Sequence, residues 1–206
     1  MKLYYSPGAC SLSPHIALLE AGLPYDLVKV DLRAKKLENG DDFLKVNPKG
    51  QVPALRLDSG ELVTEGPVIV QMIADQAAAK NLAPPRDSAE RYKLLEWLNF
   101  ITSELHKNFG PMFSPVLADE AKAFFKDRVM TKFKYIDSQL ADHRDYLLGK
   151  HFTVADGYLF TMLSWAERMN FDLSTLPNLL AYKARVAARP KVQEALTKEG
   201  LMKAAA

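Results

Sequence analysis

The chain has a single cysteine, Cys10, placed between a Pro-Gly turn and an apolar segment with helical spacing. Unpaired N–H groups and the helix dipole favour an anion at a helix N-terminus, so this position predicts a thiol of lowered pKa. Ser13 stands where a C-x-x-C oxidoreductase has its second cysteine. The pattern favours single-thiol over dithiol chemistry, whereas a lone cysteine without a function would be a small buried apolar residue.

Two later segments carry groups suited to a peptide-like ligand. In NPKGQVPAL (47–55), the Val52-Pro53 bond enters a strand, which predicts a cis peptide with the N–H and C=O of Val52 unpaired. In TEGPVIV (64–70), Glu65 and Gly66 begin a helix for which Thr64 is the expected cap. A helix N-terminus binds carboxylates and Glu65 can hold an ammonium, so together they fit a free amino-acid end. An edge proline and an acid that only complements the helix dipole are the simpler interpretations.

Two stripes follow helical spacing around EWLNFITSELHKNF (96–109). The apolar stripe is expected in the core and consists of Leu94, Leu98, Ile101 and Leu105. The polar stripe is either a solvated face or a wall turned toward the first part of the chain, and consists of Asn99, Ser103 and His106. The other histidines, His15, His143 and His151, lack such neighbours and are expected to be structural. With one cysteine and no ligand spacing, no metal site is expected.

The composition excludes several classes of function. A chain that is 48% hydrophobic and 25% charged is an ordinary globular protein. Its net charge of +2 comes from scattered Lys and Arg, which argues against a nucleic-acid surface. No apolar stretch approaches the ~18 residues of a membrane span, and the N-terminus lacks the apolar run of a signal peptide. One cysteine allows no intrachain disulfide, which fits a reducing compartment, so we expect a cytoplasmic protein. The charge distribution and the lack of a long apolar stretch lead us to expect that it binds neither nucleic acid nor membrane.

The elements that must position these residues change in kind near residue 80. Strands are expected at 2–5, 25–32, 51–57 and 61–63 and helices at 10–23 and 66–78, which makes residues 1–80 an α/β domain with a mixed sheet. Residues 81–87 are the expected linker. Helices are expected at roughly 88–117, 119–143, 154–170, 176–188 and 190–199, an all-α domain over residues 88–206. Thr153 and Asp156 predict a capping box at one helix start.

Taken together, these motifs resemble those of the bacterial beta-class glutathione S-transferases. The similarity runs along the chain, through KLYYSPGACSLSPHIAL, NPKGQVPAL, LVTEGP, EWLNFI and ELHKNF to FTVADGYLFTML at residues 152–163. Several motifs in the same order make it specific. The resemblance implies a glutathione S-transferase fold, with a thioredoxin-like N-terminal domain and a helical C-terminal domain. It also implies a homodimer and glutathione as co-substrate, without a metal.

The resemblance further implies roles for individual residues. Cys10 would lie beside the glutathione sulfur, and with His106 it would be nearest to the chemistry. Glutathione would be bound by the residues at matching positions, which are Cys10, Lys35, Val52, Pro53, Glu65, Gly66, Asn99, Ser103, Glu104 and His106. Among them, Lys35 would hold the glycine carboxylate and Glu104 would reach the glutathione of the partner subunit. Gly66 departs from the wider superfamily, where many classes have Ser or Thr after the acid. Asp156 would be structural.

The implied activity is conjugation of the glutathione thiolate to small apolar electrophiles in detoxification. The alternatives are thiol–disulfide exchange or reductive dehalogenation through a Cys10 mixed disulfide, and a non-catalytic ligand carrier. The group that activates the thiol stays open between Cys10, Ser11, Tyr5 and His106. An apolar wall for the electrophile is expected from Phe109, Met112, Phe113 and Trp165.

Overall fold

The N-terminal part of the chain is built on a mixed sheet of five strands in the order β3-β2-β1-β4-β5. The computed structural model describes residues 1–202. The strands are β1 (Lys2–Tyr5), β2 (Asp26–Asp31), β3 (Lys36–Leu37), β4 (Ala54–Arg56) and β5 (Leu62–Thr64). β1 pairs in parallel with β2 and antiparallel with β4, so it is the central strand. The mixed sheet is confirmed, and the two-residue strand β3 is the element that the sequence pattern missed.

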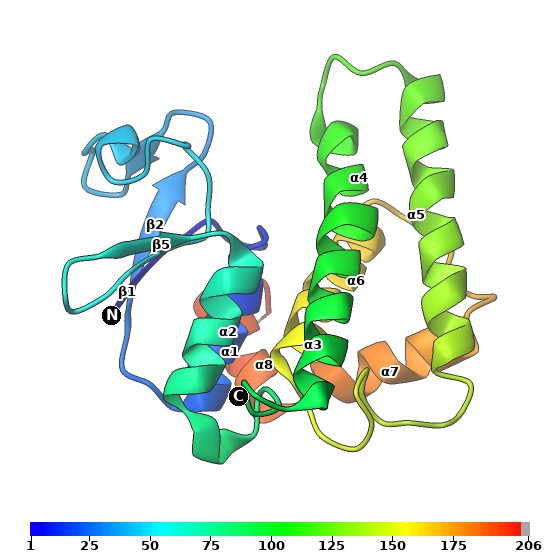
Figure 1. Cartoon of the computed structure of the whole chain (residues 1–206). Coiled ribbons are helices and arrows are strands. Elements are labelled where there is room, and N and C mark those ends of the chain that lie inside the picture. Colours follow the sequence, from blue (N-terminus) through cyan, green and yellow to red (C-terminus); the bar gives the residue numbers. More distant parts are fainter. Residues whose placement is uncertain (203–206) are drawn as a thin grey trace.

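Two helices pack beside this sheet, α1 (Leu12–Ala21) and α2 (Gly66–Gln76) (Figure 1). α1 ends where Gly22 adopts a φ of 68°, a left-handed conformation in which its N–H reaches the last carbonyl oxygens of the helix. Both helices were predicted; the expected range of α1 was two residues wider at each end, and that of α2 ended two residues later. A short 3-10 turn at Phe43–Lys45 follows β3, and another at Ala78–Lys80 follows α2.

The rest of the chain is helical. The first helical column starts with α3 (Ala89–Phe100), continues through a π-helical segment at Ile101–His106 and ends in α4 (Lys107–Phe109) and a 3-10 turn at Gly110–Phe113. The other helices are α5 (Asp119–Gln139), α6 (Val154–Arg168), α7 (Pro177–Ala187) and α8 (Pro190–Lys198). The predicted apolar stripe is confirmed as core, because Leu94, Leu98, Ile101 and Leu105 are at most 1% exposed.

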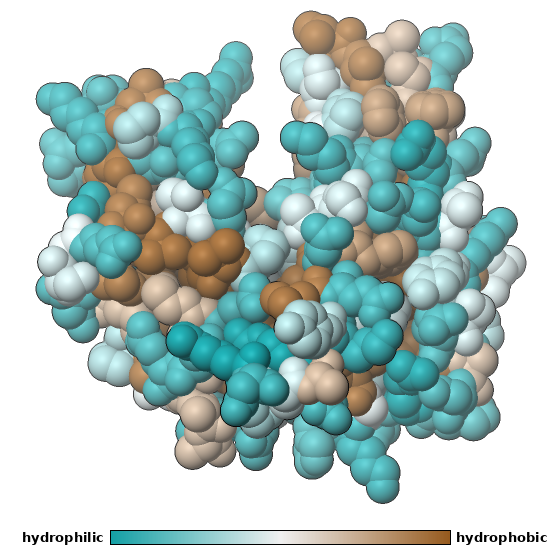
Figure 2. Space-filling model, viewed as in Figure 1, coloured by the Kyte–Doolittle hydropathy of each residue, from teal (hydrophilic) through white to brown (hydrophobic). Residues whose placement is uncertain are grey.

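α6 is the central helix of the C-terminal part. Its predicted capping box is present, with Thr153 and Asp156 exchanging side-chain and backbone hydrogen bonds. α1 packs directly on α6 and α8, so one apolar core runs from the N-terminal helices into the C-terminal bundle. A second, smaller core lies on the other face of the sheet around Tyr4, Phe43 and Val52. Above the shared core the two parts separate, and the surface between them is deeply hollowed (Figure 2).

The segment between α2 and α3 contains the two adjacent prolines, and Ser88 caps α3 by accepting a hydrogen bond from the Arg91 N–H. The domain boundaries at residues 80 and 88 remain predictions. Across residues 1–202, every helix is too short or too polar to cross a bilayer.

Candidate functional site

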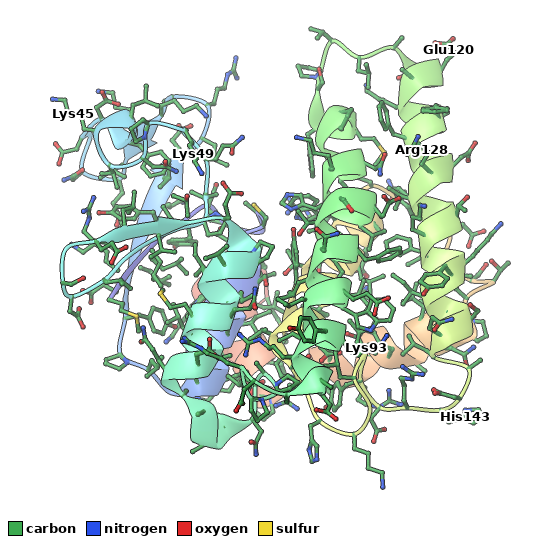
Figure 3. The ribbon with its side chains drawn as sticks, in the orientation of Figure 1. Lys45, Lys49, Lys93, Glu120, Arg128 and His143 are labelled. Atoms are coloured by element: carbon green, nitrogen blue, oxygen red, sulfur yellow. The ribbon has the colours of Figure 1, made fainter. Side chains whose placement is uncertain are left out.

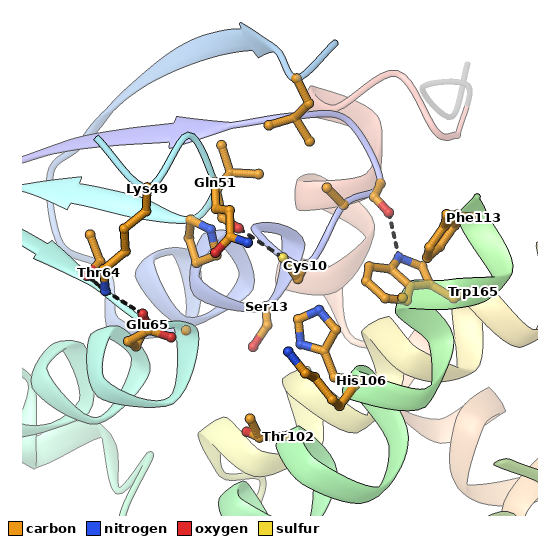
Figure 4. Close-up of a pocket in the computed structure, with 18 of the residues that line it drawn as sticks. Cys10, Ser13, Lys49, Gln51, Thr64, Glu65, Thr102, His106, Phe113 and Trp165 are labelled. Carbon is orange, nitrogen blue, oxygen red and sulfur yellow. Dashed lines mark hydrogen bonds and ion pairs between the residues drawn. The ribbon is translucent and has the colours of Figure 1, made fainter. Parts of the chain in front are cut away.

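A cleft of about 810 Å³ lies between the sheet and the helical part. Its floor is the turn that carries Cys10, one wall is made by the loop before β4 and the start of α2, and the facing wall by the helical column and α6 (Figure 4). Ligand pockets have volumes of roughly 300–1,000 Å³. This cleft therefore has room for a peptide-sized ligand together with a second small molecule.

Cys10 lies in the turn before α1 and is partly exposed to the cleft. Its Sγ donates a hydrogen bond to the Val52 carbonyl oxygen at 3.0 Å. Burial raises the pKa of the Cys10 thiol to about 12, although the backbone N–H groups of Cys10 and Ser11 act in the opposite direction. The predicted lowering of this pKa is wrong: α1 begins only at Leu12, and loss of solvent outweighs the nearby N–H groups.

The Val52-Pro53 peptide bond is cis, as the sequence predicted. The carbonyl oxygen of Val52 is not unpaired, contrary to the prediction, because it accepts the Cys10 thiol. The Val52 N–H has no protein acceptor within residues 1–202. Because Val52 lines the cleft beside the thiol, this N–H is available to a peptide ligand that accepts from it.

Glu65 and Gly66 line the opposite end of the same wall. Glu65 itself is the N-cap residue of α2, and Thr64 is the last residue of β5, so Thr64 is not the cap. The backbone of Glu65 has a φ of 69°, a strained conformation for a residue other than glycine, which directs attention to this position. Its carboxylate is 63% exposed and pairs with Lys49 Nζ at 2.6 Å. Figure 3 shows Lys49 extending from its loop.

Lys35 is a second cation of the sheet side of the cleft. Its Nζ donates to the Gly50 carbonyl oxygen at 2.7 Å, which fixes the ammonium beside the loop that leads to Val52. The backbone of Lys35 is also left-handed, with a φ of 56°. A ligand carboxylate in this part of the cleft would meet a positive charge already held in place.

His106 is a polar side chain of the facing wall, at the end of the π-helical segment. Its Nδ1 lies 2.6 Å from the Tyr158 hydroxyl, and its ring packs edge-on against Trp165 at 5.0 Å. Burial, with the nearby Lys107 charge, lowers the pKa of His106 to about 4. His106 is therefore a neutral imidazole at neutral pH, in which one ring nitrogen donates a hydrogen bond and the other accepts one.

The rest of the predicted polar wall does not line this cleft. Asn99 and Ser103 are exposed, and Glu104 pairs with Lys132 at 2.8 Å, whereas Thr102 lines the cleft with His106. The prediction assumed α-helical spacing. A π-helical turn closes on the fifth residue and rotates less per residue, so positions that share a face in an α-helix diverge across Ile101–His106.

The apolar wall is also smaller than predicted. Phe113 and Trp165 line the cleft with their rings 4.9 Å apart and nearly perpendicular. Phe109 is fully buried in the core, and Met112 is outside the cleft lining. A flat apolar ligand can therefore lie against two aromatic rings, not four apolar side chains.

Two of the four groups considered for thiol activation are misplaced for that role. Tyr5 and Ser11 are buried outside the cleft, and Ser11 Oγ is held by both backbone groups of Ser6. Cys10 and His106 do line it. The sequence interpretation missed Ser13, which lines the cleft near Cys10 and His106 (Figure 4). Its position one helical turn after Cys10 was the available signal.

The turn that carries Cys10 is fixed from the far end of the chain. Gly8 N–H donates to Glu199 Oε2 at 2.8 Å, and Gly8 C=O accepts from Trp165 Nε1 at 2.8 Å. Glu199 also pairs with His15 at 2.8 Å, and both side chains are completely buried. His15 was expected to be structural, and through Glu199 its ring links α1 to the end of α8 and to the turn that carries Cys10. No group of three or more potential metal-ligating side chains occurs within residues 1–202.

Comparisons with known proteins agree with this geometry. Residues 8–76 match the family "Glutathione S-transferase, N-terminal domain", and residues 103–199 match "Glutathione S-transferase, C-terminal domain". Glutathione S-transferase GstA of Escherichia coli O157:H7 is 49% identical over 201 residues, covering 98% of this chain and all of that protein.

Solved structures of bacterial relatives are similar over the same length. The ternary complex of BphK, a bacterial glutathione S-transferase, is 55% identical with a TM-score of 0.95, covering 98% of this chain and 100% of that one. The bacterial beta-class glutathione S-transferase of Sphingomonas chungbukensis is 51% identical with a TM-score of 0.95, at the same coverage. The chain therefore belongs to the glutathione S-transferase family, within its bacterial beta class.

Proposed function

We propose that this chain conjugates the glutathione thiol to small apolar electrophiles, with glutathione on the sheet side of the cleft and the electrophile against Trp165 and Phe113. The observation that carries the proposal is the arrangement around Cys10. The free Val52 N–H and the Glu65 carboxylate lie on one wall, and the paired aromatic rings lie on the other. One wall suits a peptide and the other suits an apolar ring. A reaction between glutathione and an apolar electrophile requires that both substrates be held side by side in this way.

The residues present fit glutathione group by group. Glu65 would hold the γ-glutamyl ammonium, replacing the Lys49 pair that it makes in the free protein. The first N–H groups of α2, beginning at Gly66, would hold the γ-glutamyl carboxylate. Val52 would donate to the peptide and Lys35 would bind the glycine carboxylate.

In this reaction the protein itself forms no covalent bond with either substrate. The glutathione thiolate attacks the electrophilic carbon, a C–S bond forms, and the leaving group departs with the bonding electron pair. A thiol with a pKa of about 12 stays protonated at pH 7, so the Cys10 S–H, which donates to the Val52 carbonyl oxygen in the free protein, can turn from it to donate a hydrogen bond to the incoming sulfur anion. Ser13 and neutral His106 are the other cleft-lining side chains placed to stabilise the anion or the leaving group.

The raised pKa of Cys10 also weighs against the redox alternative. Disulfide exchange needs a thiolate nucleophile, and the thiolate form of Cys10 is strongly disfavoured in the free protein. Conjugation uses the thiol of glutathione and needs no protein thiolate. We therefore prefer conjugation, with a detoxifying role in the cytoplasm as the physiological setting that the family resemblance suggests.

A homodimer is part of the proposal. α2 and α3 expose large apolar side chains, including Val68, Tyr92 and Leu95 at 52%, 74% and 38% exposure. A second subunit packed on these two helices would remove this apolar surface from water. Asn99 and Ser103 lie outside the cleft of their own chain, so their expected contacts with glutathione would need a second subunit. Sedimentation of a monomer at micromolar concentration would contradict this arrangement.

The function is tested by turnover and by binding. We expect steady-state conjugation of glutathione to an activated aryl chloride, followed by the absorbance of the thioether. Glu65→Gln should weaken glutathione binding about fivefold in titration calorimetry, a modest loss because the carboxylate is 63% exposed and partly screened. Glu61→Gln is the matched control, since Glu61 is an exposed acid that does not line the cleft. Equal binding by both variants would contradict the placement of the γ-glutamyl end.

A further inference from the structure

We infer that the preferred electrophile is an aromatic compound carrying a carboxylate, and that Arg168 binds this carboxylate. The inference rests on the proposed conjugation and specifies the substrate class of the same cleft. It starts from the charges of the cleft lining, which comprise the four cations Lys35, Lys49, Lys107 and Arg168 and a single carboxylate, Glu65. His106 adds no charge at neutral pH, because its pKa is about 4.

Glutathione accounts for only part of this positive charge. Lys35 and the start of α2 serve its two carboxylates, and Glu65 serves its ammonium. Lys49 pairs with Glu65 in the free protein and, when the γ-glutamyl ammonium takes its place, it remains on the loop before β4, on the sheet side of the cleft. The two remaining cations, Lys107 and Arg168, come from the helical side of the cleft, where the second substrate binds.

Arg168 is the cation next to the aromatic wall. It is one turn after Trp165 on α6, and both side chains donate to the carbonyl oxygen of Gly8, at 3.2 Å from Arg168 Nη1 and 2.8 Å from Trp165 Nε1. This shared acceptor holds the guanidinium beside the indole ring. A ring stacked on Trp165 and Phe113 would thus present an attached acid to an arginine fixed at its edge.

The guanidinium also keeps donors for a ligand. Within residues 1–202, its recorded hydrogen bond goes to Gly8, and it forms no ion pair. Glu167, its neighbour along the chain, pairs with Lys183 at 2.7 Å, and Glu199, which also accepts from the Gly8 N–H, pairs with buried His15. Arginine binds carboxylates through two parallel N–H bonds, so an aromatic acid satisfies donors that a neutral electrophile leaves unused.

The test compares an acid with its neutral ester. The substrates are 4-chloro-3-nitrobenzoate and methyl 4-chloro-3-nitrobenzoate, which react with glutathione by the same displacement of chloride. Each kcat/KM is divided by the rate constant of the uncatalysed reaction, and the readout is the acid-to-ester ratio of these quotients. We expect a ratio of about five to ten for the native protein, the size of a partly exposed charged hydrogen bond.

Arg168→Met should bring this ratio close to one, and Arg168→Lys should restore part of it. Arg128→Met is the matched control, because Arg128 projects from α5 outside the cleft and contacts the Phe124 ring (Figure 3). A native ratio near one, or a ratio unchanged within twofold in Arg168→Met, would overturn the inference. A fall in Lys107→Met with none in Arg168→Met would overturn the choice of arginine.

A binding measurement separates this inference from the proposed function. Unreactive 3-nitrobenzoate and its methyl ester are titrated into protein saturated with S-methylglutathione, with quenching of tryptophan fluorescence as the signal. If neither chloride substrate is turned over, conjugation is wrong. The acid-to-ester ratio of dissociation constants, and its loss in Arg168→Met, then still decides whether Arg168 selects an aromatic carboxylate.

Discussion

Replacing Asp156 by alanine should destabilise the fold far more than the loss of an ordinary helix cap. The carboxylate is completely buried and accepts four hydrogen bonds, from Leu147 N–H, Thr153 N–H, the Thr153 hydroxyl and the Tyr182 hydroxyl, at 2.7 to 2.9 Å. These bonds join the start of α6 to the loop before it and to α7. Alanine leaves all four donors buried without an acceptor.

The magnitude follows from that count. A helix cap alone contributes about 0.5–2 kcal/mol. Each donor left unsatisfied in the interior costs about 1–3 kcal/mol, and the costs do not add fully because the cavity admits some water. We expect a loss of about 3–5 kcal/mol in the free energy of unfolding, a large share of the roughly 5–15 kcal/mol of a typical protein. Tyr182→Phe, which removes one donor and keeps the other three, should cost about 1 kcal/mol.

The assay is urea unfolding followed by circular dichroism, combined with kcat per folded molecule. Asp119→Ala is the control, because Asp119 is also in the first turn of a helix but its side chain is 97% exposed. This control should stay within about 0.5 kcal/mol of the native protein. A loss below about 1 kcal/mol for Asp156→Ala would refute the hydrogen-bond argument. Native stability with lost turnover would refute the structural role itself, and Tyr182→Phe keeps the test open if Asp156→Ala does not fold.

Two further predictions concern the cleft. Cys10→Ala should abolish any glutathione adduct that mass spectrometry detects on oxidised protein. It should slow aryl-halide conjugation only about tenfold or less, because a single hydrogen bond is lost. A thousandfold fall in the conjugation rate would mean that Cys10 reacts in the chemical step. Since burial lowers the pKa of His106 from 6.5 to about 4, the neutral form stabilises the fold above pH 6.5, and this stabilisation is lost as the pH falls. In urea titrations, the native protein should therefore lose about 2–3 kcal/mol relative to His106→Gln between pH 7.5 and 4.5, and a constant difference would contradict a buried neutral imidazole.

The fold could be predicted from the sequence where the signal is local. The strand and helix patterns, the Val52-Pro53 bond and the capping box at Asp156 each depend on a few neighbouring residues, and the structure contains all of them. Glu65 was found as the acid at a helix start. The left-handed backbone of Glu65 was not predicted, because nothing in TEGPVIV requires it.

The side chains that face the cleft were harder to predict, since facing depends on helix geometry. The α-helical +4 and +7 spacing predicted that Asn99 and Ser103 line the cleft with His106. Because the segment is π-helical, Thr102 lines the cleft in their place. The prediction of a lowered pKa for Cys10 was wrong for a related reason. A helix start gives the direction of one electrostatic effect, but the larger effect is burial, which only the packed structure reveals.

The longest-range feature explains why the two halves of the site act as one unit. Gly8, two residues before Cys10, donates its N–H to Glu199, 191 positions later, and its carbonyl oxygen is held by Trp165 and Arg168. Gly8 has a φ of 67°, a conformation that L side chains rarely adopt, and a Cβ there would displace the Arg168 guanidinium from its place beside the Gly8 carbonyl oxygen. The turn that carries Cys10 is thus positioned by α6, the helix whose Trp165 and Arg168 line the facing wall of the cleft. We therefore expect a ligand that contacts Trp165 or Arg168 to act, through Gly8, on the same backbone that carries Cys10.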